Sequence, residues 1–315
     1  MNKNAFIQFV LKVRDVKRST AQQHYYVLQR FRNVCGQTPS SLIPHETDWV
    51  CPELFESMKD LSNTTQKNMY SSLLVYLKCS SAERTIIDIC TKHLETTARL
   101  QENAYLSQEM TEKQKSNWVD HKYIVEFFEE TQRTIKAQRL FNRETLSSSA
   151  RRLVQQYLMQ AIHGGLLPPP RLEWATMHLF QHKSDALKFS GNTVFLKPRA
   201  GINVVVGKVP KGVLLLPKSM ASLLRRYCKF VEEGSPIFVK KNGSPHTTNS
   251  YGKELQRVFH ERFQKRIGAS LLRNIYITKR YATLPALKEM RDTAGQMMHS
   301  LNTALLFYKK NSLEN

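Results

Sequence analysis

The positive charge of this chain is confined to its second part, and this division constrains the fold more than any other feature of the sequence. Residues 1–112 hold 13 Lys and Arg against 12 Asp and Glu, whereas residues 113–315 hold 34 against 14, balances of +1 and +20. A polar stretch at 106–116 separates the two regions, and 315 residues accommodate two domains of ordinary size. We therefore predict two domains, 1–110 and 111–315.

The basic character of the second domain indicates a polyanionic partner. No acidic residue occurs between Asp185 and Glu232, although nine basic residues fall there. These are Lys188, Lys197, Arg199, Lys208, Lys211, Lys218, Arg225, Arg226 and Lys229. Such a surface attracts nucleic acid, and we expect double-stranded DNA as the partner; the alternative is a basic solvated face.

Composition argues against several other classes of protein. Hydrophobic residues make up 41% of the chain, enough for packed cores, and no apolar run approaches the ~20 residues of a membrane span. The first residues lead into an amphipathic helix rather than a signal peptide, so we expect an intracellular protein without membrane contact. The five cysteines are scattered and none shows CxxC spacing, so we predict neither a disulfide framework nor a metal site.

The first domain is predicted to be a small all-helical bundle. Apolar residues at helical spacing predict helices over 5–13, from Ser19 through Phe31, over 64–77 and over 84–100. Ser19, with a glutamine three positions later, has the pattern of a capping box, and Ser62 or Asn63 is the expected cap of the third helix. Three prolines within 36–60 favour a loop with a short helix.

The second domain is predicted to be α+β. Its helices are expected over 123–139, 149–162, 219–231, 250–264, 271–281 and 301–309. Between them, three short runs of β-branched or aliphatic residues are bounded by Gly and Pro, at 193–196, 202–206 and 213–216. We predict that these strands form a small antiparallel sheet, so that the whole chain is mainly α with one small sheet.

Five side chains of the second domain suit phosphoryl transfer from DNA to a tyrosine. They follow in the order Arg171, Lys208, Arg273, His299 and Tyr308. Two guanidinium groups match the oxygens of a phosphate and stay charged, a lysine among cations is a natural proton donor, and adjacent cations lower the proton affinity of a tyrosine. Such chemistry needs no metal or cofactor, and the sequence shows neither a carboxylate cluster for Mg²⁺ nor a Walker-type loop for ATP.

Over both parts, the chain resembles the tyrosine recombinases, the phage-type integrases. Residues 298–308 are similar to the family segment in which a His-Ser turn precedes a helix whose Tyr follows the His by nine positions. Residues 270–274, Ser-Leu-Leu-Arg-Asn, resemble the His-x-Leu-Arg-His segment, and Arg171, at a tight turn before the strands, matches the first family arginine. The hairpin 206–212 resembles the turn with the catalytic lysine, where Lys208 is favoured over Lys211.

The resemblance implies a role for each of these residues. Tyr308 attacks the phosphate, Arg171 and Arg273 hold its oxygens, Lys208 protonates the leaving oxygen, and His299 orients the phosphate or the tyrosine. The first domain corresponds to the helical core-binding domain, which clamps DNA together with the catalytic domain. Family members recombine DNA as four protomers on two duplexes, so we expect a homotetramer on DNA. We expect further DNA contacts from Lys17, Arg18, Lys197, Arg199 and Lys211.

Three positions depart from the family pattern. Ser270 stands three residues before the second arginine, where the family usually has His or Lys, and a hydroxyl is not a strong acid or base. Trp174 occupies the position of an acidic residue three after the first arginine, and Met298 replaces the usual Gly before the His. Catalysis is then expected to be slower or to depend more on Lys208.

Two alternatives to a recombinase or integrase stay open. A type IB-like topoisomerase would use the same chemistry to nick and reseal one duplex as a monomer. A DNA-binding protein on the same scaffold that has lost activity is the second, and Ser270 and Trp174 favour it. The Pro-Pro-Pro-Arg arrangement at 168–171 resembles the divergent branch of mobile elements and large DNA viruses of eukaryotes, which implies the nucleus in a eukaryotic host, and otherwise the cytoplasm or nucleoid.

Overall fold

The computed structural model describes residues 3–35, 50–180, 193–196, 203–206, 213–282 and 287–305. The chain divides into two compact units, Met1–Ser107 and Gln108–Asn315. The division falls inside the polar stretch 106–116 where the sequence changes its charge balance. Each unit has its own hydrophobic core.

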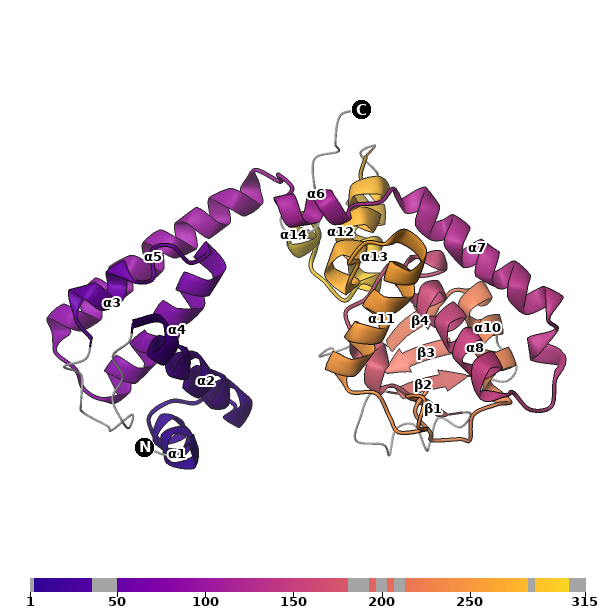
Figure 1. Cartoon of the computed structure of the whole chain (residues 1–315), viewed down its shortest axis with the longest axis horizontal. Coiled ribbons are helices and arrows are strands. Elements are labelled where there is room, and N and C mark those ends of the chain that lie inside the picture. Colours follow the sequence, from indigo (N-terminus) through magenta and orange to yellow (C-terminus); the bar gives the residue numbers. More distant parts are fainter. Residues whose placement is uncertain are drawn as a thin grey trace. The chain divides into compact units, whose positions relative to one another are not determined.

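The first unit is helical throughout its described residues (Figure 1). Its helices are α1 (Lys3–Val13), α2 (Arg18–Cys35), α3 (Pro52–Glu56), α4 (Asn63–Cys79) and α5 (Arg84–Leu106). Their apolar faces enclose a core around Phe6, Phe31 and Tyr76. This confirms the predicted helical character.

Of the N-caps predicted for two helices of the first unit, one is confirmed and the other is wrong. Ser62 caps α4, because its hydroxyl accepts a hydrogen bond from the backbone N–H of Thr65 at 3.4 Å. The predicted cap Ser19 is wrong: α2 begins at Arg18, and the N–H groups of Thr20 and Ala21 bond to the carbonyl of Lys17. Ser19 therefore lies within the first turn.

The second unit surrounds one small sheet with helices (Figure 1). Its first part contains α6 (Glu112–Asn117), α7 (His121–Ala137), η1 (Leu140–Asn142), α8 (Ser148–Gln160), the wide turn η2 (Ala161–Gly165) and η3 (Glu173–Thr176). Its later helices are α10 (Lys218–Cys228), α11 (Thr248–Phe263), α12 (Ala269–Arg280), α13 (Leu287–Gln296) and α14 (Leu301–Thr303). The sequence prediction missed α6 and α13, both rich in polar residues.

The sheet is mixed, not purely antiparallel as predicted. Its order is β1 (His178–Phe180), β2 (Thr193–Leu196), β3 (Asn203–Val206) and β4 (Val213–Leu216). Strands β2, β3 and β4 pair antiparallel, with Val206 opposite Val213, whereas β1 pairs parallel with β2. The strand missed in the sequence is β1, because three residues with two adjacent buried side chains give no alternating pattern.

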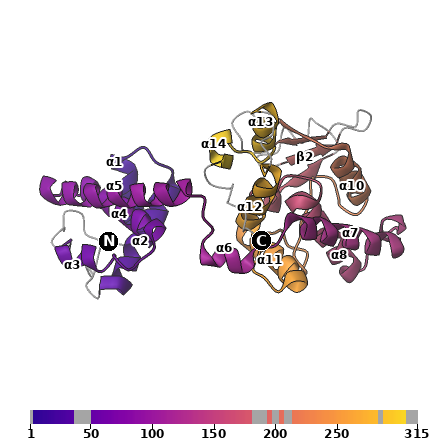
Figure 2. The same ribbon diagram turned by 90° about the horizontal axis from the view of Figure 1, so that it is seen from above.

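A separate small cluster lies at the end of the described chain. Ile277 of α12 and Tyr281, the residue after α12, pack there with Ala294 of α13, with Met297 directly after α13, and with Ala304. Figure 2 shows α12, α13 and α14 beside one another. The main core of the unit lies apart from this cluster, around Trp174, Tyr251 and Leu272.

Candidate active site

Arg273 is held inside the protein by two hydrogen bonds. It lies on α12 with only 6% of its surface exposed. Its Nη1 donates to the carbonyl oxygen of Pro170 at 3.1 Å, and its Nη2 donates to the hydroxyl of Ser270 at 3.2 Å. Burying a guanidinium is costly unless its N–H groups are bonded, so these contacts fix its orientation. Ser270 thus supports the arginine.

A wide turn brings Arg171 next to this site. Helix α8 ends in η2, where the N–H of Leu166 donates to the carbonyl of Ala161, five residues earlier, at 2.8 Å. Gly164 has φ +127°, and a Cβ on Gly165 would lie 2.6 Å from the Phe128 ring, so both positions favour glycine. The buried prolines 168–170 follow, and exposed Arg171 comes directly after the carbonyl that Arg273 binds.

His299 lies within the electrostatic reach of both arginines. Burial, followed by the positive charges of Arg171 and Arg273, lowers the pKa of His299 from 6.5 to about 4. Its ring is therefore neutral at pH 7 and can donate one hydrogen bond and accept another. The structure thus brings together three of the five side chains that the sequence singles out.

The turn before His299 places a methionine in a backbone conformation that favours glycine. Met298 has φ +56°, in the left-handed region that costs about 1 kcal/mol for a residue with a Cβ. Its N–H bonds to the carbonyl of Gly295, and the N–H of His299 bonds to the carbonyl of Ala294, both at 2.9 Å. These bonds close the end of α13 and set the position of His299.

A second histidine, not considered in the sequence analysis, lies behind Arg273. His163, in η2, is fully buried, and its Nε2 lies 3.2 Å from the hydroxyl of Tyr251. Burial, and then the charge of Arg273, lowers the pKa of His163 to about 3, while burial raises the pKa of Tyr251. A neutral ring can therefore pack close to the guanidinium. The only sequence signal is a histidine immediately before the glycine pair.

Five predicted site residues lie outside the described residues. Lys208 and Lys211 belong to the connection 207–212 between β3 and β4, and Lys197 and Arg199 belong to the connection 197–202 between β2 and β3. Tyr308 follows the last described residue, Leu305, by three positions. Their roles stay predictions.

The segment that leads to Tyr308 is anchored within the unit. The side-chain amide of Gln108 donates to the carbonyl oxygen of Leu305 at 2.9 Å. Ala304 is fully buried in the C-terminal cluster. The chain therefore leaves the described residues from a fixed point near α12.

Two surfaces carry exposed basic groups suited to DNA. Lys17 and Arg18 are exposed at the start of α2 in the first unit. In the second unit a groove of about 1080 Å³ runs between α8, α11 and the segment 239–246. Its basic residues are Arg151, Arg152, Lys240 and Lys241, and its acidic residues are Glu254 and Glu261. The sequence analysis did not identify this groove, because its walls are distant in sequence.

The described residues contain neither a cluster of metal ligands nor a helix suited to span a membrane. No group of three His, Cys, Asp or Glu side chains is placed there to hold a metal ion. Among the same residues, no helix is long and apolar enough to cross a membrane.

Comparison with known proteins gives structural neighbours and no sequence relatives. No family model and no curated protein matches the chain. The crystal structure of the XerA recombinase matches with a TM-score of 0.40 and 13% identity, over 98% of this chain and 94% of that one. The XerH site-specific recombinase, in a pre-cleavage complex with its difH substrate, matches with a TM-score of 0.40 and 14% identity, over 93% of each chain.

Proposed function

We propose that this protein is a tyrosine-type DNA strand transferase, a site-specific recombinase or integrase that works through a 3′-phosphotyrosyl intermediate. The observation that carries the proposal is the placement of Arg171 directly after the Pro170 carbonyl that Arg273 binds at 3.1 Å, with His299 near enough for both positive charges to lower its pKa. Two guanidinium groups beside a neutral imidazole suit a phosphodiester, whose charge grows as it is attacked. A bound phosphate would partly offset the repulsion that His299 feels from the arginines.

In the proposed reaction, a named residue acts at each bond that forms or breaks. The phenolic oxygen of Tyr308 forms a bond to phosphorus while the bond to the 5′ oxygen breaks. Lys208 gives that oxygen its proton and leaves a free 5′ hydroxyl. Arg171 and Arg273 bind the non-bridging oxygens, and neutral His299 donates a hydrogen bond to the phosphate or orients the tyrosine. The ester keeps the bond energy, so the reverse reaction joins strands without ATP or metal.

The two units have different proposed tasks. The second, whose residues 113–315 carry a balance of +20, acts as the catalytic domain on duplex DNA. The helical first unit acts as a core-binding domain, with Lys17 and Arg18 on the DNA backbone. Lys197, Arg199 and Lys211 add contacts from the strand connections. Assembly as a homotetramer on DNA, with action in a mobile element or virus, completes the proposal.

Ser270 favours one competing function, a DNA-binding protein that no longer cleaves. Its hydroxyl accepts a hydrogen bond from Arg273 and has no acid strength to assist the leaving group. In a binding protein, the two arginines would hold a phosphate without further reaction. The two functions differ in one product, the covalent protein–DNA link.

A suicide-substrate assay distinguishes these functions. The protein is incubated in EDTA with a labelled pool of nicked duplex fragments from the source genome, and adducts that resist SDS are counted. The wild type should form an adduct, and Tyr308→Phe should abolish it because the nucleophile is removed. Tyr123→Phe, which changes an exposed tyrosine on α7, is the matched control and should react like the wild type.

The other outcomes of this assay assign the competing functions. Tight DNA binding without an adduct would favour the inactive scaffold. An adduct with Tyr308→Phe would place the nucleophile elsewhere. Relaxation of supercoiled DNA by a monomer, without strand exchange between duplexes, would favour the type IB-like topoisomerase.

A further inference from the structure

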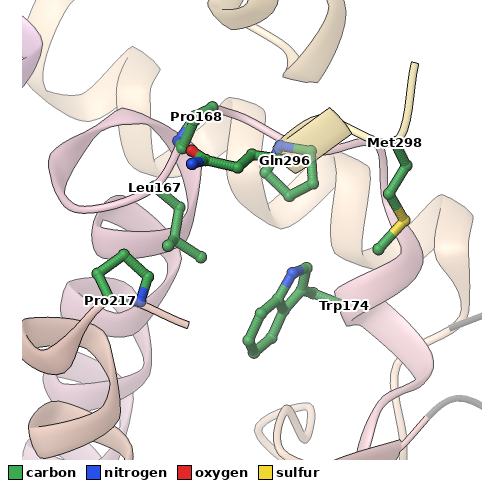
Figure 3. Close-up of a pocket in the computed structure, with 7 residues that line it drawn as sticks. Leu167, Pro168, Trp174, Pro217, Gln296 and Met298 are labelled. Atoms are coloured by element: carbon green, nitrogen blue, oxygen red, sulfur yellow. The ribbon is translucent and has the colours of Figure 1, made fainter. Parts of the chain in front are cut away.

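Trp174 and Met298, two positions that depart from the family pattern, line the same cavity. It holds about 10 Å³, roughly the space of one water molecule. Its other walls come from Leu167, Pro168, Pro170, Pro217 and Gln296. In Figure 3 the Met298 side chain points toward the indole ring of Trp174. Residues 124 positions apart in sequence thus meet beside the candidate active site.

The left-handed conformation of Met298 sends two neighbouring methionines into different clusters. Met297 is fully buried in the small C-terminal cluster with Tyr281 and Ala304. Met298 packs instead against the main core, of which Trp174 is a member. The turn that ends in His299 is therefore held between the two clusters. Met298 is the apolar residue of this turn that reaches the main core.

Trp174 connects this packing to the arginines. It lies on η3, three residues after Arg171, with only 1% of its surface exposed. Pro170, another wall of the cavity, supplies the carbonyl that accepts the hydrogen bond from Arg273. The cavity is therefore lined by residues on both sides of Arg171, Pro170 and Trp174, and by the residue immediately before His299.

We propose that Trp174 and Met298 are positioning residues, whose packing across this cavity holds the His299 turn against Arg171 and Arg273. The inference rests on the proposed function and deepens it, because it assigns to an apolar interaction the placement of the histidine relative to the phosphate site. Neither residue touches the reacting atoms. The strained backbone of Met298 is tolerated because its side chain gains this packing.

Substitution of Met298 separates backbone from side chain. Met298→Gly removes the strain of the left-handed conformation and also the packing against Trp174. Met298→Leu keeps the strain and most of the apolar volume. If the Met298 side chain positions His299, the His299 ring should move away from the two arginines in the glycine variant, although the backbone of that variant is relaxed. In the leucine variant the ring should stay beside the arginines.

The test uses NMR of the full-length protein with labelled histidine, without DNA. The His299 signal is assigned by its absence in His299→Gln. In the wild type and in Met298→Leu this signal should stay unchanged between pH 5.5 and 7.5, since the pKa of His299 lies well below that range. In Met298→Gly it should titrate with a midpoint closer to 6.5, because the ring has moved away from the arginines and toward water. Met298→Ala, which also lacks the methionine side chain that packs on Trp174, should titrate in the same way.

Two results would overturn the proposal. A His299 signal that stays unchanged in folded Met298→Gly and Met298→Ala would show that another interaction places the ring. Unfolding of these variants at 25 °C would assign Met298 to global stability instead.

The adduct assay keeps this inference distinct from the proposed function. Met298→Gly should reduce the rate of adduct formation about tenfold or more relative to the wild type. Met298→Leu should keep a rate close to that of the wild type. If no protein forms an adduct, including the wild type, while the NMR result is as expected, the strand-transfer proposal fails and the positioning role stands. If the wild type forms the adduct and the His299 signals of the glycine and alanine variants stay unchanged, the strand-transfer proposal stands and the positioning role fails.

Discussion

The cores of the two units differ in the polar groups that they enclose. Among the described residues, the buried polar side chains of Met1–Ser107 are Ser72, Ser80 and Thr97, all hydroxyls. Those of Gln108–Asn315 include an arginine, two histidines, an asparagine and two glutamines, namely Arg273, His163, His246, Asn274, Gln155 and Gln160.

Among the described residues, the polar side chains buried in the core of the first unit are hydroxyls, whereas the core of the second unit also fixes the position of a charged group. Ser72 and Thr97 donate to carbonyls four residues earlier in their own helices, at 2.9 and 2.8 Å, so each hydroxyl has an acceptor within the same helix. Arg273 depends on a carbonyl 103 residues away in sequence. Only tertiary structure can satisfy such a group, and in return the tertiary structure fixes where its charge lies.

The largest effect is expected from changing the buried arginine. Arg273→Lys keeps one positive charge but loses the planar fork that binds Pro170, Ser270 and, in the proposed function, a phosphate oxygen. The rate of adduct formation on a suicide substrate should fall about 10²- to 10³-fold. Arg84→Lys, in an exposed ion pair of the first unit, is the matched control and should leave the rate unchanged. If the rate falls equally in both variants, the buried arginine of the second unit has no special role in the reaction.

An intermediate effect is expected from pH. The pKa of His163, about 3 in the folded chain, lies below its ordinary value of 6.5, so the unfolded chain binds a proton that the folded chain excludes. The stability contributed by the neutral ring is therefore complete above pH 6.5 and is lost as the pH falls toward 3, by about 1.4 kcal/mol per pH unit.

Urea unfolding at pH 7, 6 and 5 measures this loss. Tryptophan emission can follow the second unit, which contains Trp118 and Trp174. His163→Gln should have a lower free energy of unfolding at pH 7 but a shallower dependence on pH. The same pH slope in the variant and the wild type would show that His163 does not titrate on unfolding.

The smallest effect is expected at the exposed basic residues of the first unit. Replacement of both Lys17 and Arg18 by Ala should weaken DNA binding a few-fold, equally for all sequences, because these side chains would contact phosphates. The slope of log affinity against log salt should become shallower by about 1 for each phosphate that the variant no longer neutralises. Fluorescence anisotropy over a salt series measures both. An unchanged slope would assign DNA binding to the second unit alone.

Most of the fold is encoded in local pattern, and the missed elements lack one. The long helices α4, α7 and α11 carry apolar residues at helical spacing, and the predictions came within two residues of their described ends. The short strand β1 has adjacent buried residues, and α6 has no buried residue at all. For such elements, tertiary context rather than the local sequence decides the conformation.

The candidate site is only partly predictable for a similar reason. Arg171, Arg273 and His299 were found from residue type, order and the resemblance to a family. The pair His163 and Tyr251 was not, because a buried histidine acquires its meaning from a partner 88 positions away. The cavity between Trp174 and Met298 was also missed, since the sequence marked each as a departure from a pattern without indicating that they meet.

The wide turn Ala161–Gly165 restricts how this sequence can change in length during evolution. Removal of one residue there would turn the following chain by about 100° relative to α8 and shift it by about 1.5 Å. The Pro170 carbonyl would then no longer lie where Arg273 donates to it, and Arg171 would move with that carbonyl, although every candidate site residue would still be present. Related sequences that keep the arginines should therefore also keep the number of residues between His163 and Arg171, whereas the loop at 143–147 between η1 and α8 can vary in length.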